Sequence, residues 1–111
     1  MPTTIHLRDI ASARSGDKGN HANIGVVARD AAAYEILHSR LTAVRVQDHF
    51  RELGVTRVER FELPNVQALN FLLYDCLAGG ASRSLRIDTQ GKLLATSLLD
   101  ITLHIDNDEP N

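Results

Sequence analysis

The chain has 111 residues, of which 43% are hydrophobic and 23% charged, and its formal net charge is −2 at pH 7. A chain of this length supports one hydrophobic core, so we expect a single domain over residues 1–106 and a frayed acidic tail at 107–111. The charge balance argues against a nucleic-acid-binding surface, and no apolar run approaches the roughly 20 residues that a membrane span requires.

The first strands are expected on either side of a polar segment, Arg14–Asn23 ("RSGDKGNHAN"). Ile5 and Leu7 alternate with polar residues, which indicates a short strand that could continue towards Ala13. We interpret the polar segment as a loop. Alternation in residues 21–29 then predicts a strand with its apolar side chains, Ile24, Val26 and Ala28, on one face.

Two helices are expected next, preceded by the N-cap residues Asp30 and Thr42. Gly54 is placed to end the second helix in a left-handed conformation. The apolar residues of both helices recur at helical spacing and predict stripes that face the core: Tyr34, Leu37 and Leu41, then Val46, Phe50 and Leu53.

The second half of the chain predicts further strands and helices, with one ambiguous segment. Imperfect alternation over 56–63 indicates a strand that ends at Pro64. In residues 66–78 the apolar side chains fit a helical stripe, but the run 69–74 also fits a buried strand, and we favour the helix. Residues 81–88 read as a strand, 89–99 as a short helix and 100–106 as the last strand.

This order of elements predicts an α+β fold of the ferredoxin-like type. Without the first strand and the additional helix, the order is βαββαβ, in which helices pack on one face of a mainly antiparallel sheet.

The chemistry of Arg14–Asn23 suits a site for a phosphate or carboxylate. Gly16 and Gly19 leave backbone N–H groups uncovered, as in small concave anion sites. Positive charge and neutral hydrogen-bonding groups surround them. The alternative is a turn stabilised by its own Asp and Asn side chains, in which Asp17 and Lys18 form only a surface ion pair. Both interpretations remain open on residue chemistry alone.

A second polar cluster, Gly79–Ser84, overlaps the start of the strand predicted at 81–88. Alternation directs Arg83 to the same side as the core residues Leu85 and Ile87, where its charge needs an anionic partner. Asp17 or a bound anion would serve, and the alternative is an Arg83 that extends to solvent at the strand edge.

No spacing of the five histidines matches a metal-binding motif, and we expect neither a metal nor a cofactor. The single cysteine, Cys76, lies on the apolar stripe proposed for 66–78, so we assign it to core packing. It cannot form an internal disulfide, and the N-terminal segment lacks the pattern of a signal peptide. We therefore expect a cytoplasmic protein.

Three segments together resemble the small ferredoxin-fold domain at the C-terminal end of acyclic terpene utilisation (AtuA) proteins. They are "ARSGDKGNHANIGVVAR" (Ala13–Arg29), "LPNVQALNFLL" (Leu63–Leu73) and "GGASRSLRIDTQGK" (Gly79–Lys92). The resemblance covers nearly the whole sequence and implies the free-standing form of that domain, in a setting of acyl-CoA and terpenoid acid catabolism. It also implies two sets of motif positions: Arg14, Ser15, Gly16, Asp17, Lys18, Gly19, Asn20, Asn23 and Gly25, then Gly79, Gly80, Ser82, Arg83 and Ser84.

Our main hypothesis is a non-catalytic accessory domain that binds a small anionic ligand, or completes the site of a larger AtuA-type or acyl-CoA enzyme. The ligand-binding candidates are Arg14, Ser15, Gly16, Asp17, Lys18, Gly19, Asn20, Asn23, Ser82, Arg83 and Ser84. One alternative is a small enzyme in which Asp17 or His21 is the general base. Another is a structural module that forms a homo-oligomer or docks a partner through a sheet face or an edge strand.

Overall fold

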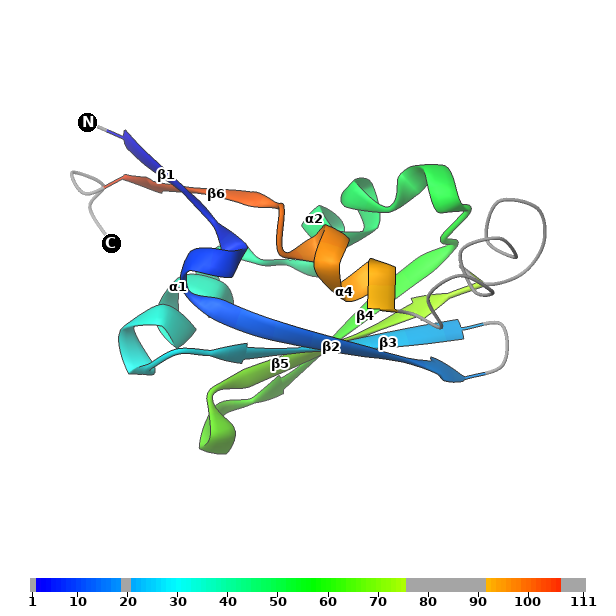
Figure 1. The fold of residues 1–111 in the computed structure, drawn as a ribbon, viewed down its shortest axis with the longest axis horizontal. Coiled ribbons are helices and arrows are strands. Elements are labelled where there is room, and N and C mark those ends of the chain that lie inside the picture. Colours follow the sequence, from blue (N-terminus) through cyan, green and yellow to red (C-terminus); the bar gives the residue numbers. More distant parts are fainter. Residues whose placement is uncertain (1, 19–20, 76–91, 107–111) are drawn as a thin grey trace.

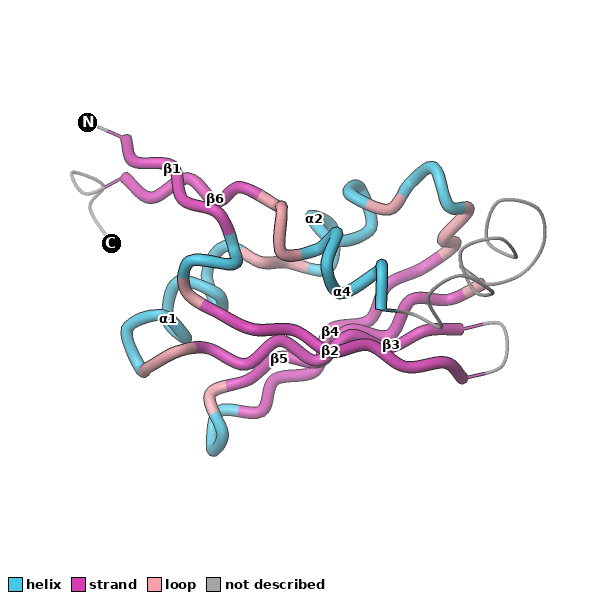
Figure 2. Tube along the Cα trace, viewed as in Figure 1, coloured by secondary structure: helices cyan, strands magenta, loops and turns pink. Residues whose placement is uncertain are grey.

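The computed structural model describes residues 2–18, 21–75 and 92–106, and the side chains of 4–16, 21–75 and 94–105. Within these ranges the chain forms six strands, three α-helices and three short 3-10 helices (Figures 1 and 2). The strands are β1 (Pro2–His6), β2 (Ala11–Lys18), β3 (His21–Ala28), β4 (Arg57–Leu63), β5 (Ala68–Tyr74) and β6 (Thr102–Asp106). The α-helices are α1 (Ala31–Arg40), α2 (Ala43–His49) and α4 (Lys92–Leu98), and the 3-10 helices are η1 (Leu7–Asp9), η2 (Arg51–Leu53) and η3 (Pro64–Val66).

The main sheet is antiparallel, with the strand order β2-β3-β5-β4. Because β5 pairs antiparallel with both β3 and β4, these two strands run parallel to each other, and α1 and α2 connect them. This is the split βαβ arrangement of a ferredoxin-like fold. The three α-helices described lie on one face of the main sheet (Figure 1), which confirms the α+β prediction.

The N-terminal strands are arranged differently from our expectation. The first strand ends at His6 and η1 follows, so β2 is a separate strand that pairs with β3 at the sheet edge. The last strand, β6, pairs with β1 in a second, two-stranded sheet. Residues 14–18 and 21–23 are therefore strand, and the loop interpretation is wrong for them; residues 19–20 lie outside the described residues.

The helix that we favoured for 66–78 is wrong, because residues 68–74 form β5. Leu69, Phe71 and Leu73 have no exposed surface and point into the core, whereas Leu72 lies half-buried on the opposite face. Since β5 is a central strand with apolar residues on both faces, its apolar residues do not alternate with polar ones, and this hides the period of two.

The other elements follow the sequence closely where the structure describes them. The Asp30 carboxylate accepts a hydrogen bond from the Ala33 N–H at 2.8 Å, and the Thr42 hydroxyl accepts one from the Arg45 N–H at 3.1 Å, so both N-caps are confirmed. Gly54 has a φ of 80° and ends η2, the turn that follows α2. α4 confirms the helix expected at 89–99, while the strand predicted at 81–88 lies outside the described residues.

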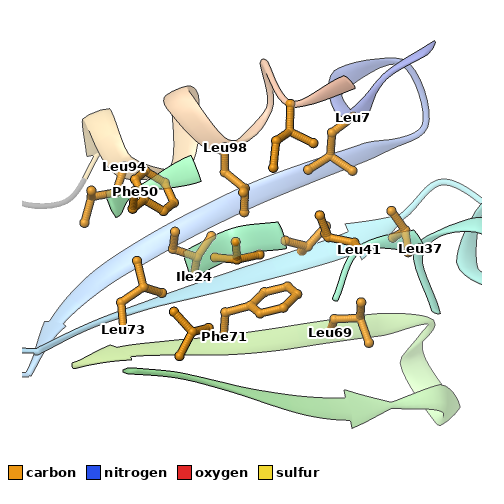
Figure 3. Close-up of a cluster of buried hydrophobic side chains, with 14 of the residues drawn as sticks. Leu7, Ile24, Leu37, Leu41, Phe50, Leu69, Phe71, Leu73, Leu94 and Leu98 are labelled. Carbon is orange, nitrogen blue, oxygen red and sulfur yellow. The ribbon is translucent and has the colours of Figure 1, made fainter. Parts of the chain in front are cut away.

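The hydrophobic core fills the space between the main sheet and the helices (Figure 3). Ile24 and Phe71 supply its sheet side, and Leu37, Leu41 and Leu98 cover them from the other layer. Burial of each side chain of this size contributes about 1.5–3 kcal/mol to the free energy of folding. The core therefore stabilises the packing of the helices on this face of the sheet. No α-helix in the described part of the chain has the length and apolarity to cross a membrane.

Candidate functional site

The candidate site lies on the face of the main sheet that the described helices leave uncovered, here called the open face. Core residues such as Ile24 and Phe71 occupy the other face, so the residues that alternate with them point to the open face. By register these positions are Ser12, Arg14 and Gly16 on β2, His21, Asn23, Gly25 and Val27 on β3, Asn70, Leu72 and Tyr74 on β5, and Arg57, Glu59, Phe61 and Leu63 on β4.

Gly16 leaves room for a pair of amide side chains on the open face. Asn23 Nδ2 donates to Asn70 Oδ1 at 3.3 Å, which links β3 to β5. A Cβ atom at Gly16 would lie 3.2 Å from Asn23 Oδ1, and one at Gly25 would lie 3.8 Å from Asn70 Oδ1. Glycine at 16 is therefore explained by the close approach of Asn23, which is a spatial requirement. Among the described glycines, only Gly54 has a positive φ. The backbone conformation at position 16 therefore does not itself require glycine.

Arg14 borders this amide pair. It lies opposite Gly25 in the β2–β3 register, and its side chain is exposed. No hydrogen bond or ion pair joins its guanidinium to the side chains and backbone that the structure describes. The open face therefore presents a cation beside neutral amide groups.

A second group of side chains lies at the end of the sheet where β3 and β4 begin and β5 ends. The Tyr74 hydroxyl donates to Glu59 Oε1 at 2.5 Å, the short distance expected for a phenol bound to a carboxylate. The Arg57 guanidinium lies 4.1 Å from the centre of the Tyr74 ring, and the His21 ring centre lies 4.9 Å from it. Tyr74, and secondarily Glu59, raises the pKa of Arg57, which remains a cation at any physiological pH.

The hydrogen bonds of His21 define its tautomer. The Asp75 N–H donates to His21 Nδ1 at 2.9 Å, so Nδ1 carries no proton and the neutral ring has its proton on Nε2. Asp75 makes this bond from a left-handed conformation with a φ of 66°, immediately after β5. His21 therefore presents an N–H donor from Nε2, and its basic nitrogen is occupied.

The structure brings together some of the residues predicted for the site and separates others. Arg14, Gly16 and Asn23 lie together on the open face, and His21 lies near its end. Ser15 alternates with them and lies opposite the core residue Ile24, on the face that carries the helices. The side chains of Asp17 and Lys18 are outside the described set, as are all of Gly19, Asn20, Ser82, Arg83 and Ser84.

Four residues of this face were missed from the sequence: Arg57, Glu59, Asn70 and Tyr74. The helix assigned to 66–78 hid Asn70 and Tyr74, because only a period of two places both of them on the side opposite Phe71. Arg57 and Glu59 were hidden by the imperfect alternation of β4, although Val58 between them is buried as a strand pattern would require.

A Ser–His pair on the helix layer has the wrong hydrogen bonding for nucleophilic catalysis. His49 Nε2 lies 2.9 Å from the Ser97 carbonyl oxygen and 3.1 Å from its hydroxyl, beside a hollow of about 410 Å³. Because a carbonyl oxygen only accepts, Nε2 carries the proton and cannot remove one from the hydroxyl. Among the residues described, no three His, Cys, Asp or Glu side chains gather closely enough to hold a metal ion.

Comparison with known proteins identifies the family. No curated protein and no solved structure matches the chain. The AtuA ferredoxin-like domain profile matches residues 5–104, a range that includes β2 to β5 and the open face. The chain therefore belongs to the AtuA ferredoxin-like domain family.

Proposed function

We propose that this single domain, taken as residues 1–106, is an accessory module that binds a small anionic ligand on the open face beside Arg14. The ligand class is a carboxylate or a phosphate such as those of coenzyme A, in a setting of acyl-CoA and terpenoid acid catabolism. With its ligand bound, the open face either acts alone or completes the site of a larger AtuA-type or acyl-CoA enzyme. The observation that supports the proposal is the exposed Arg14 guanidinium, which has no partner among the described groups.

The surroundings of Arg14 suit an oxyanion. A guanidinium binds a carboxylate or phosphate through two parallel N–H groups, and such charge-assisted bonds are about twice as strong as neutral ones. Asn70 Nδ2 adds a neutral donor on the same face, because the hydrogen bond with Asn23 uses only its Oδ1 atom. An exposed cation on a flat sheet gives modest affinity by itself, and a partner enzyme that covers the face would strengthen the interaction by excluding water.

An enzymatic role with His21 as general base has less support. His21 Nδ1 already accepts the Asp75 N–H, and Nε2 is a donor, so the neutral ring has no free basic nitrogen. The same ring can donate a hydrogen bond to an anion. This favours a binding role for His21 over a catalytic one.

The binding proposal is tested by calorimetry of the intact chain with three probes: acetate, inorganic phosphate and acetyl-CoA. At least one probe should bind, and Arg14→Ala and Lys18→Ala should each weaken that binding about tenfold, because a charge-assisted contact contributes roughly 1.5–3 kcal/mol. Arg51→Ala is the matched control, since Arg51 is an exposed arginine on η2, paired with Asp48, outside the main sheet. The absence of binding by the wild-type chain to all three probes would refute ligand binding by the isolated domain. Equal loss in the Arg51 control would refute the assignment to Arg14.

A further inference from the structure

Four residues form one continuous row across the open face, from β2 at one edge of the main sheet to β4 at the other. Arg14 lies opposite Gly25, and Gly25 lies opposite Asn70. Asn70 in turn lies opposite Phe61. Adjacent strands are about 4.8 Å apart, so the backbones of Arg14 and Phe61 are about 14 Å from each other. The row has a cation at one end and an aromatic ring at the other, with an amide and a position without a side chain between them.

The Phe61 ring is accessible to a ligand. Phe61 is 45% exposed, on the face that the three α-helices described leave uncovered (Figure 1). Among the residues described, no other aromatic ring and no cation stacks on it. An accessible ring is a platform for a nucleobase of any kind, because every base has a π-face.

The middle of the row is open and polar. Gly25 has no side chain, and a Cβ atom built there would come no closer than 3.8 Å to its neighbours. Asn70 Nδ2 is available as a donor, because the hydrogen bond with Asn23 uses only Asn70 Oδ1. Space beside an amide donor suits the hydroxyl groups of a ribose. It does not suit an acyl chain, which would cover the amide without giving it a hydrogen-bond partner.

The charges of the open face suit a ligand with few phosphates. Of the two arginines at the described positions of this face, Arg57 stacks on the Tyr74 ring and lies 3.8 Å from Glu59 Oε1. Glu59 also accepts the Tyr74 hydroxyl. Arg14 is therefore the guanidinium that remains for a ligand. One cation suits the diphosphate of a single nucleotide, whereas a nucleic acid strand is bound by several cations along its phosphates.

We propose that the open face binds a nucleoside diphosphate group, as found in free ADP and in the ADP portion of coenzyme A. The diphosphate lies on the Arg14 guanidinium, the ribose lies over Gly25 beside Asn70, and the base stacks on Phe61. This inference rests on the proposed function, because it places the anion on Arg14, and it adds a ribose and a base to that anion. An extended nucleotide reaches both ends of the row, whereas acetate or inorganic phosphate reaches only one.

Calorimetry of the full chain with ADP, coenzyme A, pyrophosphate and adenosine tests the proposal. ADP or coenzyme A should bind about tenfold tighter than pyrophosphate, the size of effect expected when one base stacks on an aromatic side chain. Whichever of the two binds tighter identifies the source of the group. Adenosine should bind about tenfold or more weakly than ADP, because it lacks the charge-assisted contact with Arg14.

Substitutions at the two ends of the row separate the two contacts. Phe61→Leu should remove the advantage of ADP over pyrophosphate and leave pyrophosphate binding unchanged, and Phe61→Tyr should keep that advantage because it keeps a ring. Arg14→Ala should weaken the binding of ADP and pyrophosphate alike. Leu63→Ala is the matched control, because Leu63 is also 45% exposed and occupies the next open-face position on β4, but has no ring. It should leave the affinity for ADP unchanged.

The outcomes distinguish this inference from the proposed function, provided that circular dichroism shows every variant to be folded. If no probe binds, or if Arg14→Ala weakens the binding of none, both fail together. If pyrophosphate binds through Arg14 but neither ADP nor coenzyme A binds more tightly, the nucleotide inference alone is overturned. An affinity for ADP that Phe61→Leu leaves intact, or that Leu63→Ala reduces equally, also overturns it.

Discussion

Replacing Gly16 and Gly25 separately with alanine tests whether position 16 must be glycine to accommodate the Asn23–Asn70 amide pair. Both residues lie in strands without positive φ, so alanine is compatible with the backbone at either position. By restricting the unfolded chain, such a substitution stabilises a protein by about 0.4–1 kcal/mol where it meets no obstacle. The two positions differ in what the added methyl group would contact.

At Gly25 the new Cβ would lie 3.8 Å from Asn70 Oδ1, an ordinary contact, so the full gain should be seen. At Gly16 it would lie 3.2 Å from Asn23 Oδ1, which requires the Asn23 amide to move by a few tenths of an ångström. The Asn23–Asn70 hydrogen bond is already 3.3 Å long, so this movement should break it at a cost of about 0.5–1.5 kcal/mol. Gly16→Ala should therefore be neutral or destabilising, and should fall about 1 kcal/mol below Gly25→Ala in free energy of unfolding.

Thermal and urea unfolding followed by circular dichroism measure this difference. For a chain of this length 1 kcal/mol corresponds to about 4 °C in melting temperature, which is well resolved. Asn23→Ala in the Gly16→Ala background serves as the control, because the added methyl group then has no amide to displace. Equal stabilisation by the two single substitutions would refute the argument that Gly16 is required by the position of Asn23.

Two further matched pairs test the side-chain arrangement by unfolding measurements. Tyr74→Phe should destabilise the domain by about 1 kcal/mol, because it removes the hydrogen bond to the partly exposed Glu59 carboxylate. Tyr34→Phe should be neutral or stabilising, because the buried Tyr34 hydroxyl has no hydrogen-bond partner among the described residues. The opposite order would contradict the hydrogen bonding described here. Phe71→Ala should cost about 3–5 kcal/mol, and Phe61→Ala should stay within about 0.5 kcal/mol, because Phe71 is fully buried and Phe61 is 45% exposed on the open face. Similar costs for the two would show that β5 does not present residue 71 to the core.

Local patterns in the sequence were sufficient where one short-range interaction decides the structure. Asp30 and Thr42 cap their helices through their own side chains, and Gly54 adopts the left-handed conformation that ends a helical segment. The alternation in β3 likewise identified Ile24 and Val26 as core residues, because one face of this strand is apolar and the other is mixed. The order of elements predicted the ferredoxin-like fold, the family resemblance supported it, and the profile match confirms it.

The sequence determined the composition of the open face on β2 and β3, where Arg14, Gly16 and Asn23 belong to one recognisable motif. Only the tertiary structure decided that this segment is a strand pair, because the hydrogen bonds that make it so come from residues on facing strands. It also decided that residues 68–74 are the strand β5, since pairing on both sides outweighs the helical spacing of their leucines. The partners of the motif, Asn70 and Tyr74, and the separate ribbon of β1 and β6 follow from that long-range pairing, which no local period encodes.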